Sequence, residues 1–99
     1  MIAMTLMGHA GETKSLAYQA MKAAKEGKFD EAEEFMKQST EEMLKAHELQ
    51  TDLIVREAGG EKIDVGLIMV HSQDHLMTAI LFKELAKEFI EVYKRLEQK

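Results

Sequence analysis

No proline interrupts this chain of 99 residues, and only six of its residues are glycine. Proline is the strongest helix breaker, by about 3 kcal/mol in a helix interior, so its absence permits long uninterrupted helices. The chain is also rich in the helix formers alanine, leucine, glutamate and lysine, and it contains eight methionines. These features predict an all-α fold, and the length is that of one domain covering residues 1–99.

Glycines divide the chain into three helical segments. Gly27 follows two lysines, which is typical of a helix end with cations near its negative pole. The next helix is predicted to begin at Asp30, an N-cap acid with Glu33 three residues on. The second break is the glycine pair at residues 59–60, with Asp64 as the predicted N-cap of the third helix. The predicted helices span residues 2–26, 30–57 and 64–97.

Apolar residues recur every three or four positions in each segment, which places them on one face of a helix. The stripe of the first segment contains Ile2, Leu6, Ala10, Leu16, Ala17, Ala20, Met21 and Ala24. The stripe of the second contains Ala32, Phe35, Met36, Met43, Ala46, Leu49 and Leu53. The stripe of the third contains Leu67, Ile68, Leu81, Phe82, Leu85, Phe89, Val92 and Leu96. Short connections predict an antiparallel three-helix bundle. Because the third segment is apolar on more than one side, it is predicted to pack against another chain in an oligomer.

Four polar residues interrupt the apolar stripe of the third segment. They stand three or four residues apart and therefore share one side of the helix: His71, Asp74, His75 and Thr78. The stripe is predicted to be core, where a carboxylate costs several kcal/mol unless it is paired or bound to a metal. This set of four residues, the polar cluster, is therefore the candidate functional site.

Spacing alone leaves three interpretations of the polar cluster open. In the first interpretation, the polar cluster is a hydrogen-bonded network that fixes helix register in a non-catalytic helical adaptor. In the second interpretation, the cluster is a zinc site built on His71 and His75. Ser72, however, stands where the two-histidine motif of zinc hydrolases has its catalytic glutamate. In the third interpretation, one histidine is a nucleophile that accepts a group such as a phosphoryl and then gives it up. The other two histidines, His9 and His47, are interpreted as packed or half-exposed residues.

Charge and composition exclude several classes of function. Eighteen acidic and thirteen basic residues give a net charge of −5, which argues against nucleic acid as the main partner. The absence of cysteine excludes disulfides, thiolate metal sites and thiol nucleophiles. No stretch approaches the roughly 20 apolar residues of a membrane-spanning helix, and the first residues lack the basic start of a signal peptide. We therefore expect a cytoplasmic protein that does not insert into the membrane.

The run Val-His-Ser-Gln-Asp-His-Leu-Met-Thr at residues 70–78 resembles the signature of a known family. It is similar to the lactose/cellobiose-type enzyme IIA component of the bacterial phosphoenolpyruvate-dependent sugar phosphotransferase system. The resemblance continues in residues 11–18, 27–32, 46–47 and 50–54, and it covers nearly the whole chain.

The resemblance implies a three-helix subunit assembled as a homotrimer, acting as a phosphotransferase component with a phosphohistidine intermediate. By this resemblance His71 accepts a phosphoryl group from phospho-HPr and passes it to a IIB component during uptake of a sugar of the cellobiose, chitobiose and lactose class. Gln73 and His75 would support His71 through hydrogen bonds. Asp74 would meet its two symmetry mates around a divalent cation, expected to be magnesium, on the threefold axis.

Overall fold

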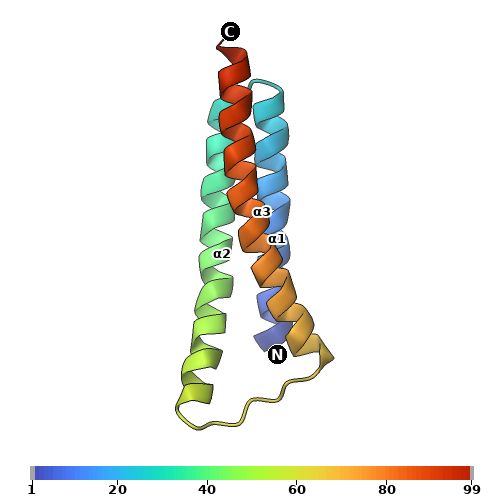
Figure 1. Cartoon of the computed structure of the whole chain (residues 1–99), viewed down its shortest axis with the longest axis vertical. Coiled ribbons are helices and arrows are strands. Elements are labelled where there is room, and N and C mark those ends of the chain that lie inside the picture. Colours follow the sequence, from blue (N-terminus) through green and yellow to red (C-terminus); the bar gives the residue numbers. More distant parts are fainter. Residues whose placement is uncertain (1, 99) are drawn as a thin grey trace.

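The computed structural model describes residues 2–98 as three antiparallel α-helices (Figure 1). α1 spans Ile2–Lys25, α2 spans Phe29–Ala58 and α3 spans Leu67–Glu97. The bundle is slender, with extents of 56 × 20 × 16 Å. Since the described residues contain no strand, the predicted all-α three-helix fold is confirmed. Within the same residues, none of the helices combines the length and the apolarity needed to cross a membrane.

Both predicted N-caps are wrong. α2 begins at Phe29, because Gly27 adopts a left-handed φ of 80° and reverses the chain early enough for helical hydrogen bonding to start at once. Asp30 is therefore inside the first turn, where its charge still favours the helix dipole. α3 begins only at Leu67, after an extended Gly66, so Asp64 lies in the connection. Neither N-cap residue makes a side-chain capping hydrogen bond.

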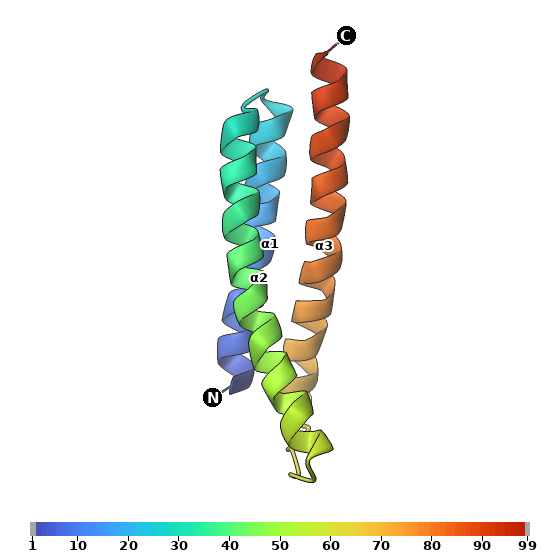
Figure 2. The ribbon, with the colours of Figure 1, turned by 90° about the vertical axis from the view of Figure 1, so that its left-hand side faces the viewer.

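The core is built around the small residues of α1. One buried cluster contains Leu6, Ala10, Ala46, Leu76 and Ala79. A second contains Ala20, Ala23, Ala24, Ala32 and Ile90. Because alanine lets helices approach closely, α1 packs against both other helices along its length. α2 and α3 touch each other far less, and Figure 2 shows the C-terminal half of α3 well separated from α2 in that view.

Most of the large apolar side chains of α3 face outward, which corrects the predicted core stripe of the third helix. Leu67 is 85% exposed and Leu81 is 60% exposed. The exposed members of the predicted stripe are Leu67, Ile68, Leu81, Leu85, Phe89, Val92 and Leu96. The buried positions of α3 are instead Ser72, Leu76, Ala79, Ala86 and Ile90. Three of these five are small residues, which allow α3 to approach the alanine face of α1 closely, and most of the bulky residues of α3 are left on the surface.

Candidate functional site

The polar cluster lies on the outward side of α3, not in the core of the chain. His71, Asp74 and Thr78 are exposed and His75 is half-buried. Three of the four belong to a series spaced by three or four residues, which we call the α3 seam: Leu67, His71, Asp74, Thr78, Leu81, Leu85, Phe89, Val92 and Leu96. Such spacing is that of the contact line of a coiled coil. The polar residues therefore interrupt an exposed apolar seam near the start of α3.

His71 and His75 are brought into direct contact by their i, i+4 spacing on one helix. Their Nε2 atoms are 3.1 Å apart, and the rings meet edge to face at 85° with centroids 4.5 Å apart. The Nδ1 atom of His75 is buried and has no hydrogen-bond partner among residues 2–98. Because a buried N–H without an acceptor is rare in proteins, we assign the His75 proton to Nε2. His75 then donates to His71 Nε2, which keeps a lone pair as a nucleophile requires.

Gln73 does not join this histidine pair. Its Oε1 atom accepts a hydrogen bond from Gln50 Nε2 at 2.8 Å, and its Nε2 atom lies 3.9 Å from the sulfur of Met69. The expected hydrogen bond between Gln73 and His71 therefore does not occur within the chain. Gln50 stands 23 residues away on α2. Gln50 lies in segment 50–54, which is part of the family resemblance, but no spacing pattern in the sequence connects Gln50 to the polar cluster.

Asp74 presents its carboxylate on the α3 seam. Its backbone carbonyl accepts a hydrogen bond from Thr78 Oγ1 at 2.8 Å, while its carboxylate has no hydrogen bond or ion pair within residues 2–98. Carboxylate oxygen suits a hard cation such as magnesium. No group of three histidine, aspartate or glutamate side chains within residues 2–98 could hold a metal ion. Asp74 thus fits a cation only if copies of the chain share it, and a zinc site at His71 and His75 lacks a third ligand among the described residues 2–98.

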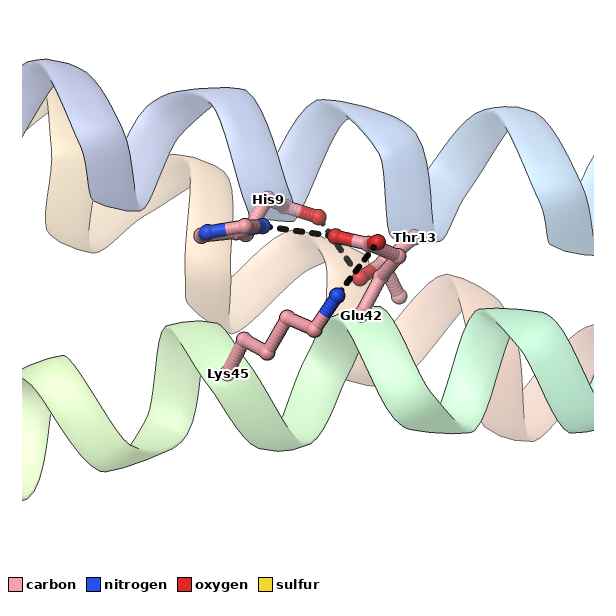
Figure 3. A network of polar contacts seen from close by, with 4 residues as sticks. All are labelled: His9, Thr13, Glu42 and Lys45. Carbon is pink, nitrogen blue, oxygen red and sulfur yellow. Dashed lines mark hydrogen bonds and ion pairs between the residues drawn. The ribbon is translucent and has the colours of Figure 1, made fainter.

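His9 belongs to a different network, which joins α1 to α2 (Figure 3). Its Nδ1 atom lies 2.6 Å from Glu42 Oε2, and Lys45 Nζ lies 3.2 Å from the other carboxylate oxygen. Thr13 Oγ1 donates to the backbone carbonyl of His9 at 2.8 Å. The hydrogen bond from His9 lowers the pKa of Glu42; burial opposes this effect and Lys45 adds to it. His47 is exposed on α2.

The lowered pKa of Glu42 makes stability depend on pH in one direction. An acid whose pKa is lower in the folded state stabilises the fold above its unfolded pKa, and this contribution is lost as the pH falls through the folded pKa. Glu42→Gln is therefore expected to destabilise the protein by about 1 kcal/mol at pH 7. Urea unfolding from pH 7 to pH 3 should show the parent and variant curves converging below about pH 4.5. Glu41→Gln is the control, and an equal penalty at every pH would contradict the prediction.

Two grooves border the α3 seam. One, of about 600 Å³, lies between α1 and α3 and is lined by Lys14, Ser15, Tyr18, Thr78, Leu81, Phe82 and Leu85. The other, of about 300 Å³, lies between α2 and α3 and is lined by Gln50, Leu53, Ile54, Glu57, Ile63, Val65, Met69, Val70 and Gln73. The exposed His71 thus lies on a helix flanked on both sides by largely apolar grooves, the kind of surface that other proteins bind.

Residues 1–94 match the family described as the lactose/cellobiose-specific IIA subunit of the PTS system. The galactose-specific EIIA component of Lactococcus lactis subsp. cremoris (strain MG1363) is 48% identical over 96 residues, which are 97% of this chain and 83% of that protein. The crystal structure of the cellobiose-specific enzyme IIA from Bacillus anthracis superposes with a TM-score of 0.97 at 47% identity, covering 99% of this chain and 90% of that one.

A further similar structure is that of the IIA(Chitobiose)–HPr complex of the N,N'-diacetylchitobiose branch of the Escherichia coli phosphotransferase system. Its matching chain superposes with a TM-score of 0.84 at 44% identity, and the match covers 97% of this chain and 93% of that one. The family match spans most of the sequence, and the relatives are similar in both sequence and fold. This chain therefore belongs to the lactose/cellobiose-specific IIA family of the sugar phosphotransferase system.

Proposed function

We propose that this chain is a phosphocarrier, in which His71 accepts a phosphoryl group from phospho-HPr and passes it to a IIB component. The observation that carries the proposal is the exposed His71 ring, whose Nε2 atom lies 3.1 Å from His75 Nε2. Membership of the IIA family and the similarity to a IIA–HPr complex support the choice of partners. The proposed sugar class is that of cellobiose, chitobiose and lactose, after the names of the relatives.

In the proposed reaction, the Nε2 lone pair of His71 attacks the phosphorus atom held by the donor's imidazole. The new N–P bond forms as the donor's N–P bond breaks, and that electron pair returns to the donor nitrogen. The proton on His71 Nδ1 stays in place during the attack. His75 Nε2–H, released from the His71 lone pair, then donates to a phosphoryl oxygen. Such a transfer depends chiefly on positioning and on stabilisation of the phosphoryl charge.

The proposed assembly is a homotrimer formed along the α3 seam from Asp74 to Leu96, with His71, one turn nearer the start of α3, left accessible to the donor. Its members Leu81, Leu85 and Phe89 are each about half exposed or more, although their size would normally place them inside a protein. A continuous apolar line at coiled-coil spacing is stable only when other helices cover it. The number of copies, three, is the number that the resemblance to the IIA family implies. In such a trimer, three copies of Asp74 would lie at one level of the seam.

We further propose that these three Asp74 carboxylates hold one divalent cation, with magnesium as the expected ion. When bound, the cation would neutralise charges that otherwise repel one another. Asp74→Leu is expected to lose the metal and remain trimeric, because replacing buried charges with apolar side chains is often neutral or stabilising by roughly 1–4 kcal/mol. Removing the cation from the parent protein leaves the three charges behind and should weaken the trimer.

Inductively coupled plasma mass spectrometry measures the metal content, and light scattering measures the mass of the assembly. Together they check both expectations. Asp64→Leu changes an exposed aspartate outside α3, so it should keep both the metal and the trimer. If Asp74→Leu became monomeric while a chelator left the parent trimer intact, Asp74 would have another role.

Incubation with phosphoenolpyruvate, enzyme I and HPr tests the proposed function. The expected product carries one acid-labile, base-stable phosphate per chain, as a phosphohistidine does. Adding a IIB component of the same sugar class should discharge it. A chain that takes up no phosphate under these conditions would contradict the proposal and favour the helical-adaptor interpretation.

A further inference from the structure

The turn that bears His71 follows a helix start that has no side-chain cap. The N-cap residue of α3 is Gly66, which has no side chain to cap the helix. The first helical residue, Leu67, is 85% exposed. Residues 61–66 before it are not helical. The first turn of a helix leaves backbone N–H groups without helical partners, and an uncapped start tends to fray. His71 stands only four residues into α3, so the position of its ring depends on contacts made by its own turn.

Two polar contacts join α2 to α3 within residues 2–98, and one of them is at this turn. Gln50 Nε2 donates to Gln73 Oε1 at 2.8 Å. The other joins Lys94 Nζ to Glu33 Oε1 at 3.6 Å, at the opposite end of α3. Since α2 and α3 otherwise touch little, the Gln50–Gln73 bond is the polar link that fixes the start of α3 against α2.

The Gln50–Gln73 bond lies in partly buried, largely apolar surroundings. Both glutamines are half-buried, and they line the groove of about 300 Å³ between α2 and α3 whose other walls are mostly aliphatic. A hydrogen bond in such apolar surroundings is stronger than one in water, and a partner left unpaired there is costly. Gln73 precedes Asp74 and lies between His71 and His75 in sequence. A shift of Gln73 along or around the helix axis therefore moves both rings.

We propose that Gln50 is a positioning residue for phosphoryl transfer, acting through Gln73 to hold the turn that carries His71 and His75. The inference rests on the proposed function, in which His71 is the nucleophile. Gln50 touches neither histidine ring. Its effect is to keep His71 Nε2 aimed at the donor while His75 Nε2 stays within hydrogen-bond reach. Transfer in which the protein mainly positions the reacting groups is sensitive to displacements of about 1 Å.

Gln50→Met tests the proposal, because methionine keeps the length of the side chain and removes the amide donor. In single-turnover transfer from phospho-HPr we expect the rate at saturating donor to fall roughly tenfold, with the half-saturating donor concentration unchanged. Gln73→Met should show the same loss, and the double variant should be no slower than either single one. Gln38→Met is the matched control, because the amide of Gln38 bonds Glu34 within α2, and it should transfer at the parent rate.

A second measurement does not depend on activity. In ¹⁵N spectra of the imidazole rings, Gln50→Met should shift or broaden the His71 and His75 signals, whereas Gln38→Met should leave them as in the parent protein. Parent-like rates with parent-like ring signals in Gln50→Met would overturn the proposal. A change confined to the half-saturating donor concentration would also overturn it, since Gln50 would then act in docking. A parent protein that takes up no phosphate would refute the proposed function, while the ring signals would still decide whether Gln50 positions the histidines.

Discussion

His71→Ala is expected to abolish phosphate uptake from phospho-HPr, by more than about a thousandfold, while the helices and the oligomer remain intact. Alanine removes the lone pair that forms the N–P bond in the proposed reaction. The His71 side chain is exposed, so its loss leaves no cavity in the core. Labelling from phosphoenolpyruvate through enzyme I and HPr measures the uptake, and circular dichroism with light scattering checks the fold and the assembly.

The other histidines provide the comparison. His75→Ala should slow the transfer by roughly ten- to a hundredfold and not eliminate it, because a group that orients the nucleophile contributes less than the nucleophile itself. His47→Ala, which changes an exposed residue on α2, should transfer at the parent rate. Phosphate mapped to His75 or His9 in the parent protein, or full labelling of His71→Ala, would refute the assignment.

Leu85→Glu is expected to convert the proposed trimer into monomers. Leu85 is 49% exposed in the single chain and lies in the apolar part of the α3 seam. In a trimer the substitution places three carboxylates at one level, where desolvation and mutual repulsion cost several kcal/mol for each charge. Because the side chain faces away from the core of its own chain, the helices themselves should persist.

Light scattering at micromolar concentration checks this expectation. The parent should have three times the chain mass of 11.3 kDa, and Leu85→Glu should have the chain mass itself. Leu44→Glu alters a similarly exposed leucine on α2, outside the seam, and should stay trimeric. A monomeric parent would rule out both the trimer and the shared cation site, while phosphate uptake by His71 would remain to be judged by labelling.

Local sequence signals predicted the helices and the neighbours within them. The absence of proline and the three- to four-residue apolar spacing correctly predicted three helices, each within three residues of its observed ends. The stripes of α1 and α2 are buried or half-buried as predicted. The contact between His71 and His75 follows from their i, i+4 positions, because a single helix sets that distance. These features involve residues close together in the chain, so the pattern of residue types is sufficient to predict them.

Only the tertiary structure decided which side of α3 is buried. Periodicity shows that residues share a face, and it does not show which partner covers that face. Ala79 packs in one buried cluster with Ala10 of α1 and Ala86 is also buried, whereas the bulky stripe with His71 and Asp74 lies outside. The bonds Gln50–Gln73 and His9–Glu42 join residues 23 and 33 positions apart. Their formation depends on how the helices are placed relative to one another, which packing over the whole bundle determines and no local pattern encodes.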